Sequence, residues 1–263
     1  MPPGATSNPI DPVFAVNAGR KIQVEVCVDS LDSSLAAQAA GADRVELCAN
    51  LLEGGTTPSS GLIAEVRRNI SMKLHVMVRP RGGDFCYTGD EFQIMQLEIA
   101  AAKGFGADGV VLGILTAEGL IDEARMRTLI DHARPMKVTC HRAIDMSRDL
   151  RKSLETLIGL GVDYVLTSGG RQTAPEGSVA IARLVRAAKG RIRVIAGSGI
   201  NERNVRRVIA ETHVTEIHVG LSDAVPGPMK YRNTKISMGK VKGREYTRFS
   251  TSQTRLAALI AAI

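Results

Sequence analysis

Two short segments near the start of the chain carry the same Glu-x-Cys pattern, Glu25-Val26-Cys27 and Glu46-Leu47-Cys48. Side chains alternate along a β-strand, so the carboxylate and the thiol of each triplet point to the same side. If the two strands lie side by side in parallel, two carboxylates and two thiols meet on one surface. Such a surface can hold a metal ion or carry out acid–base chemistry, whereas an unpartnered polar group in a core costs about 1–3 kcal/mol. The next question is which elements position these side chains.

Apolar, β-branched runs alternate with longer amphipathic stretches along the chain, the pattern of repeated β/α units. A turn with a glycine, then an acidic residue and a new strand, recurs at 40–43, 106–109 and 160–163. Eight β/α units predict a closed (β/α)8 TIM barrel as a single α/β domain, and no glycine-rich dinucleotide fingerprint follows the first strand. The predicted strands are Gln23–Asp29, Arg44–Cys48, Leu74–Pro80, Gly109–Leu115, Lys137–Ile144, Tyr164–Gly169, Arg193–Gly199 and Glu216–Leu221.

Helices are predicted between the strands, and Ser30, Ser59, Asp149 and Ser178 stand where their N-caps belong. We expect residues 21–263 to form the barrel domain and residues 1–20, rich in Pro, Gly, Ala and Ser, to be a disordered extension. The predicted helices span 31–40, 61–70, 91–104, 122–133, 149–160, 177–189 and 201–211, with a last amphipathic stretch at 253–263.

The composition limits the classes of function. Hydrophobic residues are 44% and charged residues 23% of the 263, which is ordinary for a globular protein, and no apolar run reaches the roughly 18–20 residues of a membrane span. The net charge of +7 is scattered through helices without interleaved aromatic residues, so we expect no nucleic-acid partner. With four cysteines and no secretory signal pattern, the chain is expected to be cytoplasmic with free thiols.

The C-terminal ends of barrel strands usually carry the functional groups. Read at that end, the strands offer Glu25, Glu46, Arg79 and His141 as candidate catalytic residues, because ionised groups inside a barrel need a ligand or one another. A competing interpretation pairs the two glutamates with Arg79 as a structural cluster, and one inward histidine is often only hydrogen-bonded. The two interpretations are compatible.

Cys27 and Cys48 are the candidate metal ligands. Adjacent parallel strands lie about 4.8 Å apart, close enough for two thiols to share one ion. Two thiolates with little else suit a soft ion such as Cu(I), whereas zinc normally takes four ligands. A lone strand cysteine is more often a small buried hydrophobe, which is how we interpret Cys140.

A second candidate binding region follows the seventh and eighth strands, at Gly197, Ser198, Gly199 and Gly220. Many barrels bind phosphate there through backbone N–H groups. Glycine-rich turns also have purely steric uses, so this pattern alone is only moderately specific.

Longer motifs run through the chain from about Gln23 to Met238. They are Glu25-Val-Cys-Val-Asp-Ser30, Gly41-Ala-Asp-Arg-Val-Glu-Leu-Cys48, Glu53-Gly-Gly-Thr-Thr-Pro58, Arg79-Pro-Arg-Gly-Gly-Asp-Phe-Cys-Tyr87, His141-Arg-Ala-Ile-Asp145, Leu166-Thr-Ser-Gly169 and Met229-Lys-Tyr-Arg-Asn233. With these motifs the chain resembles the CutC copper homeostasis family. The resemblance implies a cytosolic (β/α)8 barrel that forms a homo-oligomer, a dimer or tetramer, and that handles copper, with Cu(I) at Cys27 and Cys48.

Two functions stay open at this point. The first is a cytosolic copper homeostasis protein that binds Cu(I) through the two cysteines. The alternative is a lyase- or isomerase-type barrel enzyme acting on a small anionic or phosphorylated metabolite, with Glu25 or Glu46 as base and His141 as acid. In that alternative, Arg79 and the turns after strands seven and eight bind the anion. An oligomeric scaffold with a vestigial site is a third possibility.

Overall fold

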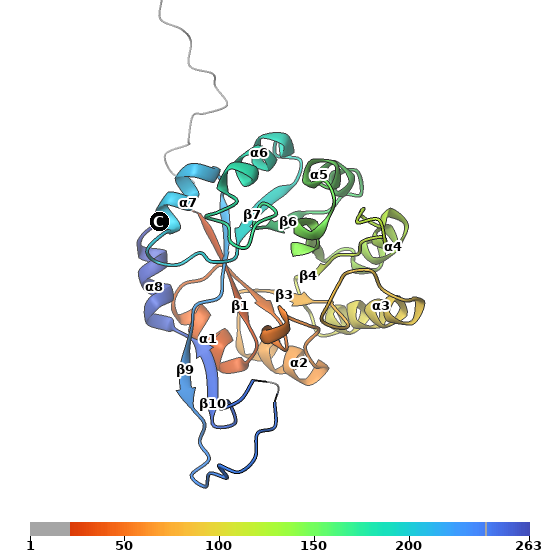
Figure 1. The fold of residues 1–263 in the computed structure, drawn as a ribbon. Coiled ribbons are helices and arrows are strands. Elements are labelled where there is room, and N and C mark those ends of the chain that lie inside the picture. The colour runs from red at the N-terminus through yellow and green to blue at the C-terminus, as the bar shows by residue number, and fades with distance from the viewer. Residues whose placement is uncertain (1–21, 240) are drawn as a thin grey trace, which may run out of the picture.

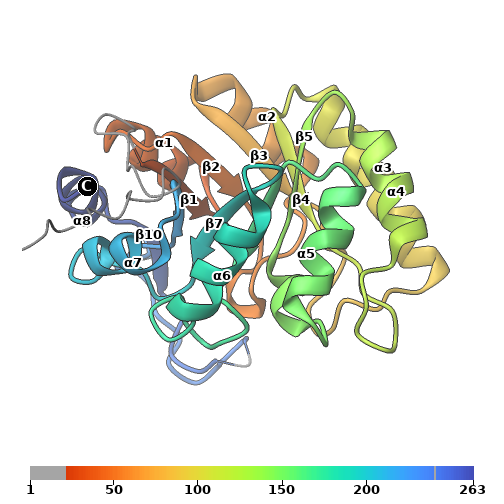
Figure 2. The same ribbon diagram turned by 90° about the horizontal axis from the view of Figure 1, so that it is seen from above.

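The computed structural model describes residues 22–239 and 241–263. Eight parallel strands pair in chain order and close into a barrel, with helices around the outside (Figures 1 and 2). The predicted TIM barrel is therefore confirmed; the expected disordered extension at residues 1–20 lies outside the described residues. The strands are β1 (Gln23–Val28), β2 (Arg44–Leu47), β3 (Lys73–Met77), β4 (Gly109–Leu112), β5 (Lys137–Cys140), β6 (Tyr164–Thr167), β7 (Arg193–Gly197) and β8 (Glu216–Val219).

Most helices begin where the sequence places a capping side chain. The hydroxyl of Ser30 accepts a hydrogen bond from the backbone of α1, and Ser59 and Asp149 do the same for α2 and α5. The prediction for Ser178 is wrong, because it is the first residue of α6 and Gly177 precedes it. The helices are α1 (Leu31–Ala39), α2 (Ser60–Asn69), α3 (Gly89–Gly104), α4 (Glu123–Ala133), α5 (Leu150–Gly159), α6 (Ser178–Ala188), α7 (Val205–Thr212) and α8 (Gln253–Ala261).

The fifth strand ends earlier than its sequence predicts. β5 stops at Cys140, and a 3-10 turn, η3 (Arg142–Met146), replaces the predicted extension to Ile144. The cause is local, because the imidazole Nδ1 of His141 accepts a hydrogen bond from the backbone N–H of Ala143 at 3.2 Å and caps the turn.

The core lies between the outer face of the barrel and the helices. Outward strand side chains such as Val26, Val45 and Leu74 are fully buried there, and each gains about 1.5–3 kcal/mol from burial. Cys140 belongs to this core, as its interpretation as a small hydrophobe predicts. The inner faces of several strands instead carry charged and polar side chains, and these build the site.

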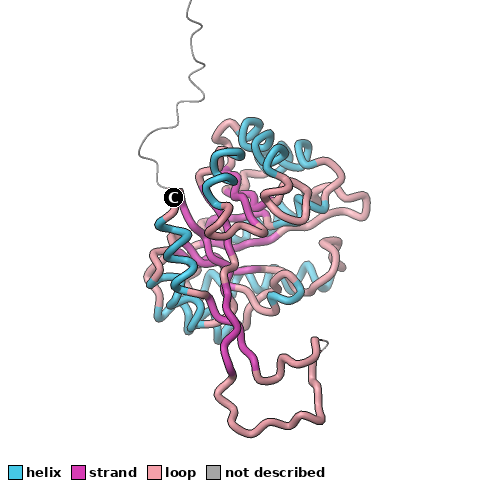
Figure 3. The backbone as a smooth tube through the Cα atoms, turned by 60° about the vertical axis from the view of Figure 1, so that its left-hand side comes forward, coloured by secondary structure: helices cyan, strands magenta, loops and turns pink. Residues whose placement is uncertain are grey.

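An antiparallel arm that the sequence analysis did not predict projects from the barrel after β8. Its strands, β9 (Ser222–Pro226) and β10 (Thr247–Thr251), pair with each other and are joined by a long loop (Figure 3). The backbone N–H of Thr251 donates to the hydroxyl of Ser33, which ties the base of the arm to α1. The chain then forms α8 within the predicted last amphipathic stretch. No helix in the described part of the chain is long and apolar enough to cross a membrane.

Candidate metal centre at the mouth of the barrel

The register between β1 and β2 brings the two Glu-x-Cys triplets together. Cys27 stands opposite Glu46, and the backbone N–H of Cys48 continues the ladder by donating to the carbonyl of Val28 at 2.8 Å. Glu25, Glu46 and Cys48 are almost completely buried, and Cys27 is partly exposed. The predicted meeting of two carboxylates and two thiols on one surface is therefore observed.

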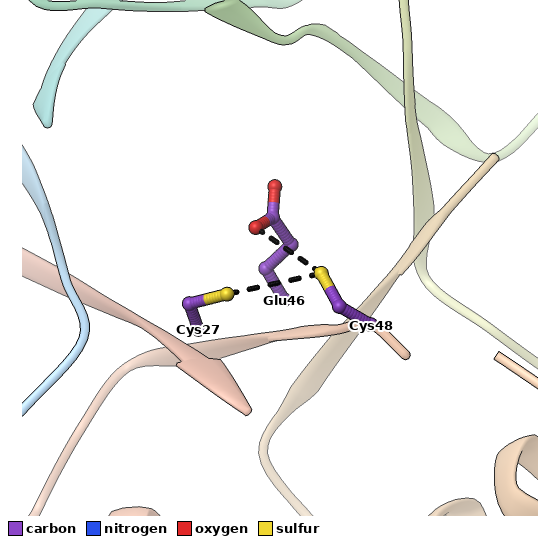
Figure 4. Close-up of side chains that lie close together, drawn as sticks. All are labelled: Cys27, Glu46 and Cys48. Carbon is purple, nitrogen blue, oxygen red and sulfur yellow. Dashed lines mark hydrogen bonds between the residues drawn. The ribbon is translucent and has the colours of Figure 1, made fainter. Parts of the chain in front are cut away.

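The two thiols lie side by side without a disulfide bond. The Sγ atoms of Cys27 and Cys48 are 3.8 Å apart, and the Cys48 thiol donates to Oε2 of Glu46 at 3.6 Å (Figure 4). For comparison, two sulfurs that bind one zinc ion at about 2.3 Å each, near the tetrahedral angle, are also about 3.8 Å apart. The spacing of the thiols therefore fits a shared metal ion.

Below the thiols, Glu25 is the centre of a buried ion cluster. The guanidinium of Arg44 donates to its Oε2, and Nδ1 of His218 lies 2.8 Å from its Oε1. Arg44 also donates to Glu216 at 3.0 Å, so this arginine is held between two carboxylates. The nearest nitrogen of His75 is 3.9 Å from Oε2 of Glu25.

The interpretation that pairs Glu25 and Glu46 with Arg79 is wrong. The Arg79 guanidinium instead donates to three loop carbonyls, those of Glu53, Gly55 and Gly83, at 2.7, 2.7 and 3.0 Å. Its side chain is buried, and no carboxylate of the described residues forms an ion pair with it. Arg79 therefore joins the loops after β2 and β3 and leaves a buried positive charge without an acidic partner.

The electrostatics of the cluster give the two thiols different pKa values. The hydrogen bond with Cys48 is the main cause that lowers the pKa of Cys27 to about 5, against the opposing effect of burial. The same hydrogen bond, together with burial, raises the pKa of Cys48 well above its ordinary value. Burial likewise raises the pKa of Glu46. One thiolate beside one protonated thiol is the state that these shifts favour at neutral pH.

The pKa values of the neighbouring Glu25 and His218 shift in opposite directions. Burial opposes the charge of Glu25, but Arg44 and His218 outweigh it and hold the pKa of this carboxyl well below its usual range. Burial also opposes a charged His218, but Glu46, Cys27 and Glu25 together raise the pKa of its imidazole well above the ordinary value. The pair is therefore an imidazolium–carboxylate pair.

A cavity of about 1310 Å³ opens above the cluster at the C-terminal ends of the strands. Cys27, Glu46 and His218 line it from β1, β2 and β8, and Arg79 and His141 line it from the ends of β3 and β5. The structure thus brings four of the six predicted catalytic and metal-binding residues to one cavity, while Glu25 and Cys48 lie beneath its lining.

His141 is neutral and holds one unused donor. Its Nδ1 accepts from the η3 backbone, so the proton of the neutral ring is on Nε2, which is buried without a hydrogen-bond partner. Burial first, and the charge of Arg79 second, lower the pKa of this imidazole to about 3. Phe85 packs against the ring with centroids 4.8 Å apart.

The second candidate binding region, predicted to bind phosphate after β7 and β8, is only partly formed. Ser198, Gly199 and Gly220 line the cavity, but the Ser198 hydroxyl already donates to the carbonyl of Gln172 at 2.9 Å. Gly197 does not line the cavity; a Cβ there would lie 2.5 Å from Cδ1 of Leu166 inside the barrel, so its role is steric.

Four residues of the cluster were missed as site residues, namely Arg44, His75, Glu216 and His218. A signal for His218 was present, since Glu216-Ile217-His218 repeats the alternation of the two Glu-x-Cys triplets. What the alternation does not show is that barrel closure pairs His218 directly with Glu25.

The fold and the site together define a (β/α)8 barrel with a thiol pair at its mouth, a candidate metal-binding barrel. The family model described as "CutC family" matches residues 22–222, and the chain belongs to this family. A CutC family protein from Mesorhizobium japonicum is 48% identical over 240 residues, covering 91% of this chain and 93% of the relative. The human relative, named copper homeostasis protein cutC homolog, is 43% identical over 249 residues, covering 94% and 91%.

Solved structures agree with this assignment. The crystal structure of a putative copper homeostasis protein CutC from Streptococcus agalactiae has a TM-score of 0.72 and 34% identity, covering 75% of this chain and 97% of that chain. A phosphoribosylanthranilate isomerase from Thermotoga maritima has a TM-score of 0.54 at 12% identity, covering 92% and 97%. This second likeness shows the barrel fold alone.

Proposed function

We propose that the protein handles copper by binding one Cu(I) ion between Cys27 and Cys48. The observation that carries the proposal is the 3.8 Å spacing of two unbridged sulfurs, with Cys27 in the lining of an open cavity and Cys48 directly beneath it. Thiolates are soft ligands that select Cu(I), and family membership with relatives named for copper homeostasis supports the same ion. The lowered pKa of Cys27 supports it too, because a thiolate is the form that binds metal.

Competition with a chromogenic Cu(I) chelator under anaerobic, reducing conditions tests this proposal. We expect the wild-type chain to retain one equivalent of Cu(I) and the Cys27→Ser, Cys48→Ser double variant to lose it. Cys86→Ser with Cys140→Ser is the matched control, since it removes the other two thiols and leaves the pair intact. Equal Cu(I) retention by both double variants would contradict the proposal.

The proposed setting is the cytoplasm. In the structure all four cysteines are free, and the pair that lies within van der Waals distance is unbridged. A reducing compartment preserves that state, whereas an oxidising one would favour a disulfide and remove both ligands.

We also propose that the chain works as a homo-oligomer held by its arm. Tyr231 and Met238, in the loop between β9 and β10, are 72% and 85% exposed, and Met229 and Ile236 are exposed beside them in sequence. Large apolar side chains gathered on a projecting segment are typical of an interface. Light scattering after size exclusion should show a dimer or tetramer for the wild type and a smaller species for Tyr231→Ser with Met238→Ser. A monomeric wild type would contradict this assignment.

The second candidate function is action on a small anionic ligand in the same cavity. The observation that favours it is the buried charge of Arg79, which has no acidic partner among the described residues, beside the unused N–H of His141. A buried cation of this kind favours an anion nearby. In this candidate Glu46, which lines the cavity, would be the base and His141 the acid; Glu25, the other base that the residue types suggest, lies beneath the lining with both oxygens engaged.

A thermal-shift screen of carboxylated and phosphorylated metabolites tests this second candidate. A true ligand should stabilise the wild type and lose its effect in His141→Asn, which keeps a capping side chain for η3 but removes the Nε2–H donor. His132→Asn, on the exposed surface of α4, is the matched control. Absence of stabilisation by every anionic compound would count against enzymatic action.

A further inference from the structure

The interior of the barrel holds a donor group for the ion that neither Glu-x-Cys triplet supplies. His218 comes from β8, at the other edge of β1, and closure of the barrel sets it directly beside Glu25. Its side chain is 12% exposed and lines the cavity together with Cys27 and Glu46. The imidazole is therefore within the cluster and accessible from the cavity.

One nitrogen of the ring is already committed. Nδ1 lies 2.8 Å from Oε1 of Glu25, while the other oxygen of that carboxylate is engaged by Arg44. Arg44 is fixed in turn by Glu216 at 3.0 Å. This chain of contacts holds the ring by its Nδ1 side and directs Nε2 away from Glu25.

Nε2 faces the groups that surround the thiols. It lies 3.7 Å from Oε2 of Glu46, and the same carboxylate oxygen accepts from the Cys48 thiol at 3.6 Å. His218 and the thiol pair are thus neighbours of one oxygen atom. Metal-binding histidines almost always donate their second ring N–H to a carboxylate, which is the arrangement of His218 and Glu25.

We infer that His218 is the third ligand of the metal site: Cu(I) would take the place of the Nε2 proton, which is released to solvent, and Glu25 is the positioning residue that holds the ring through Nδ1. The inference rests on the proposed Cu(I) site and defines it as a Cys2His centre. Imidazole is a better ligand for copper than carboxylate, whose oxygens suit harder ions. Glu46 therefore stays uncoordinated beside the ion, although one of its oxygens lies within 4.8 Å of both sulfurs.

X-ray absorption of the Cu(I)-loaded chain tests the inference, because an imidazole ligand adds outer-shell scattering that thiolates and carboxylates do not. We expect this signature in the wild type and its loss in His218→Ala, with Cu(I) affinity lowered at least about 10-fold. Glu25→Ala should weaken the signature, and Glu25→Gln should restore it, because the amide oxygen still accepts from Nδ1.

His75→Asn is the matched control. His75 also lies near Glu25, 3.9 Å from its other oxygen, but it does not line the cavity, so the imidazole signature should persist. Stoichiometric Cu(I) without imidazole scattering in the wild type would overturn this inference and leave the thiol site standing. Loss of the signature in Glu46→Gln with its retention in His218→Ala would also overturn it. Absence of stoichiometric Cu(I) in the wild type would overturn both the role of His218 and the proposed Cu(I) site at the two thiols.

Discussion

The Cα of Gly55 approaches the sulfur of Cys48 so closely that a Cβ at position 55 would lie 3.1 Å from Sγ. The loop after β2 folds back over the thiol because Ala49 and Thr56 exchange backbone hydrogen bonds at 2.9 and 2.8 Å. Gly55 has a φ of +88°, in the region that favours glycine. The loop therefore sets the position of the Cys48 sulfur from above.

Gly55→Ala should weaken Cu(I) binding by displacing that sulfur. Gly54→Ala is a closely matched control: its φ is +82°, so it carries similar strain of about 1–2 kcal/mol, but its nearest neighbour is an Arg79 nitrogen at 3.7 Å. We expect at least a tenfold lower Cu(I) affinity for Gly55→Ala and a near wild-type value for Gly54→Ala. Equal affinities in the two variants would contradict the role given to the loop.

The thiol of Cys27 should react faster with iodoacetamide than that of Cys48 at neutral pH, since a pKa of about 5 leaves it a thiolate. Peptide mapping of the alkylated apoprotein across pH measures both rates. In Cys48→Ala the hydrogen bond that lowers this pKa is lost, so the reactivity of Cys27 should fall at low pH. An unchanged pH profile in the variant would show that Cys48 is not the cause.

Acid should destabilise the fold through His141. Its pKa is about 3 in the folded chain against an ordinary value of 6.5, so between these limits only the unfolded state takes up the proton. Stability therefore falls as the pH drops from 6.5 towards 3. His141→Asn should flatten this slope by up to about 1.4 kcal/mol per pH unit, measured by urea unfolding. Parallel slopes in the two proteins would contradict a neutral buried imidazole.

Removing the carboxylate of Glu25 should destabilise the barrel strongly. Glu25 is 1% exposed and joins Arg44 to His218, so Glu25→Ala leaves buried cationic groups with one partner fewer. Loss of one member of a buried ion pair costs roughly 3–5 kcal/mol, which chemical denaturation would detect. Glu155→Ala, which breaks an exposed pair with Arg191, is the control and should change stability little. Similar losses in both variants would argue against a buried cluster.

The strands and helices were predictable because their signals are local. The strands are largely apolar, β-branched runs, and the helices α1 to α5 each begin beside a single capping side chain. The arm was missed because β9 and β10 are short and mostly exposed, so they lack the apolar alternation that marks a strand.

The cluster was harder to predict because it depends on closure of the barrel. Arg44, Lys73, Lys137 and Arg193 all begin strands, and three of them are exposed while Arg44 is 2% exposed. Arg44 is buried because it pairs with carboxylates on two other strands, Glu25 of β1 and Glu216 of β8. No local sequence pattern shows that β1 and β8 become neighbours. The triplets therefore revealed the thiol pair, but not the groups that hold it.

Anomalous diffraction at the copper edge, from crystals of the chain loaded with Cu(I), tests the central claim most directly. The account predicts a single strong peak between the sulfurs of Cys27 and Cys48, at the floor of the cavity. If the protein binds one equivalent of Cu(I) in solution but its crystals show no copper peak between these sulfurs, or show the peak elsewhere, the proposed site would be contradicted.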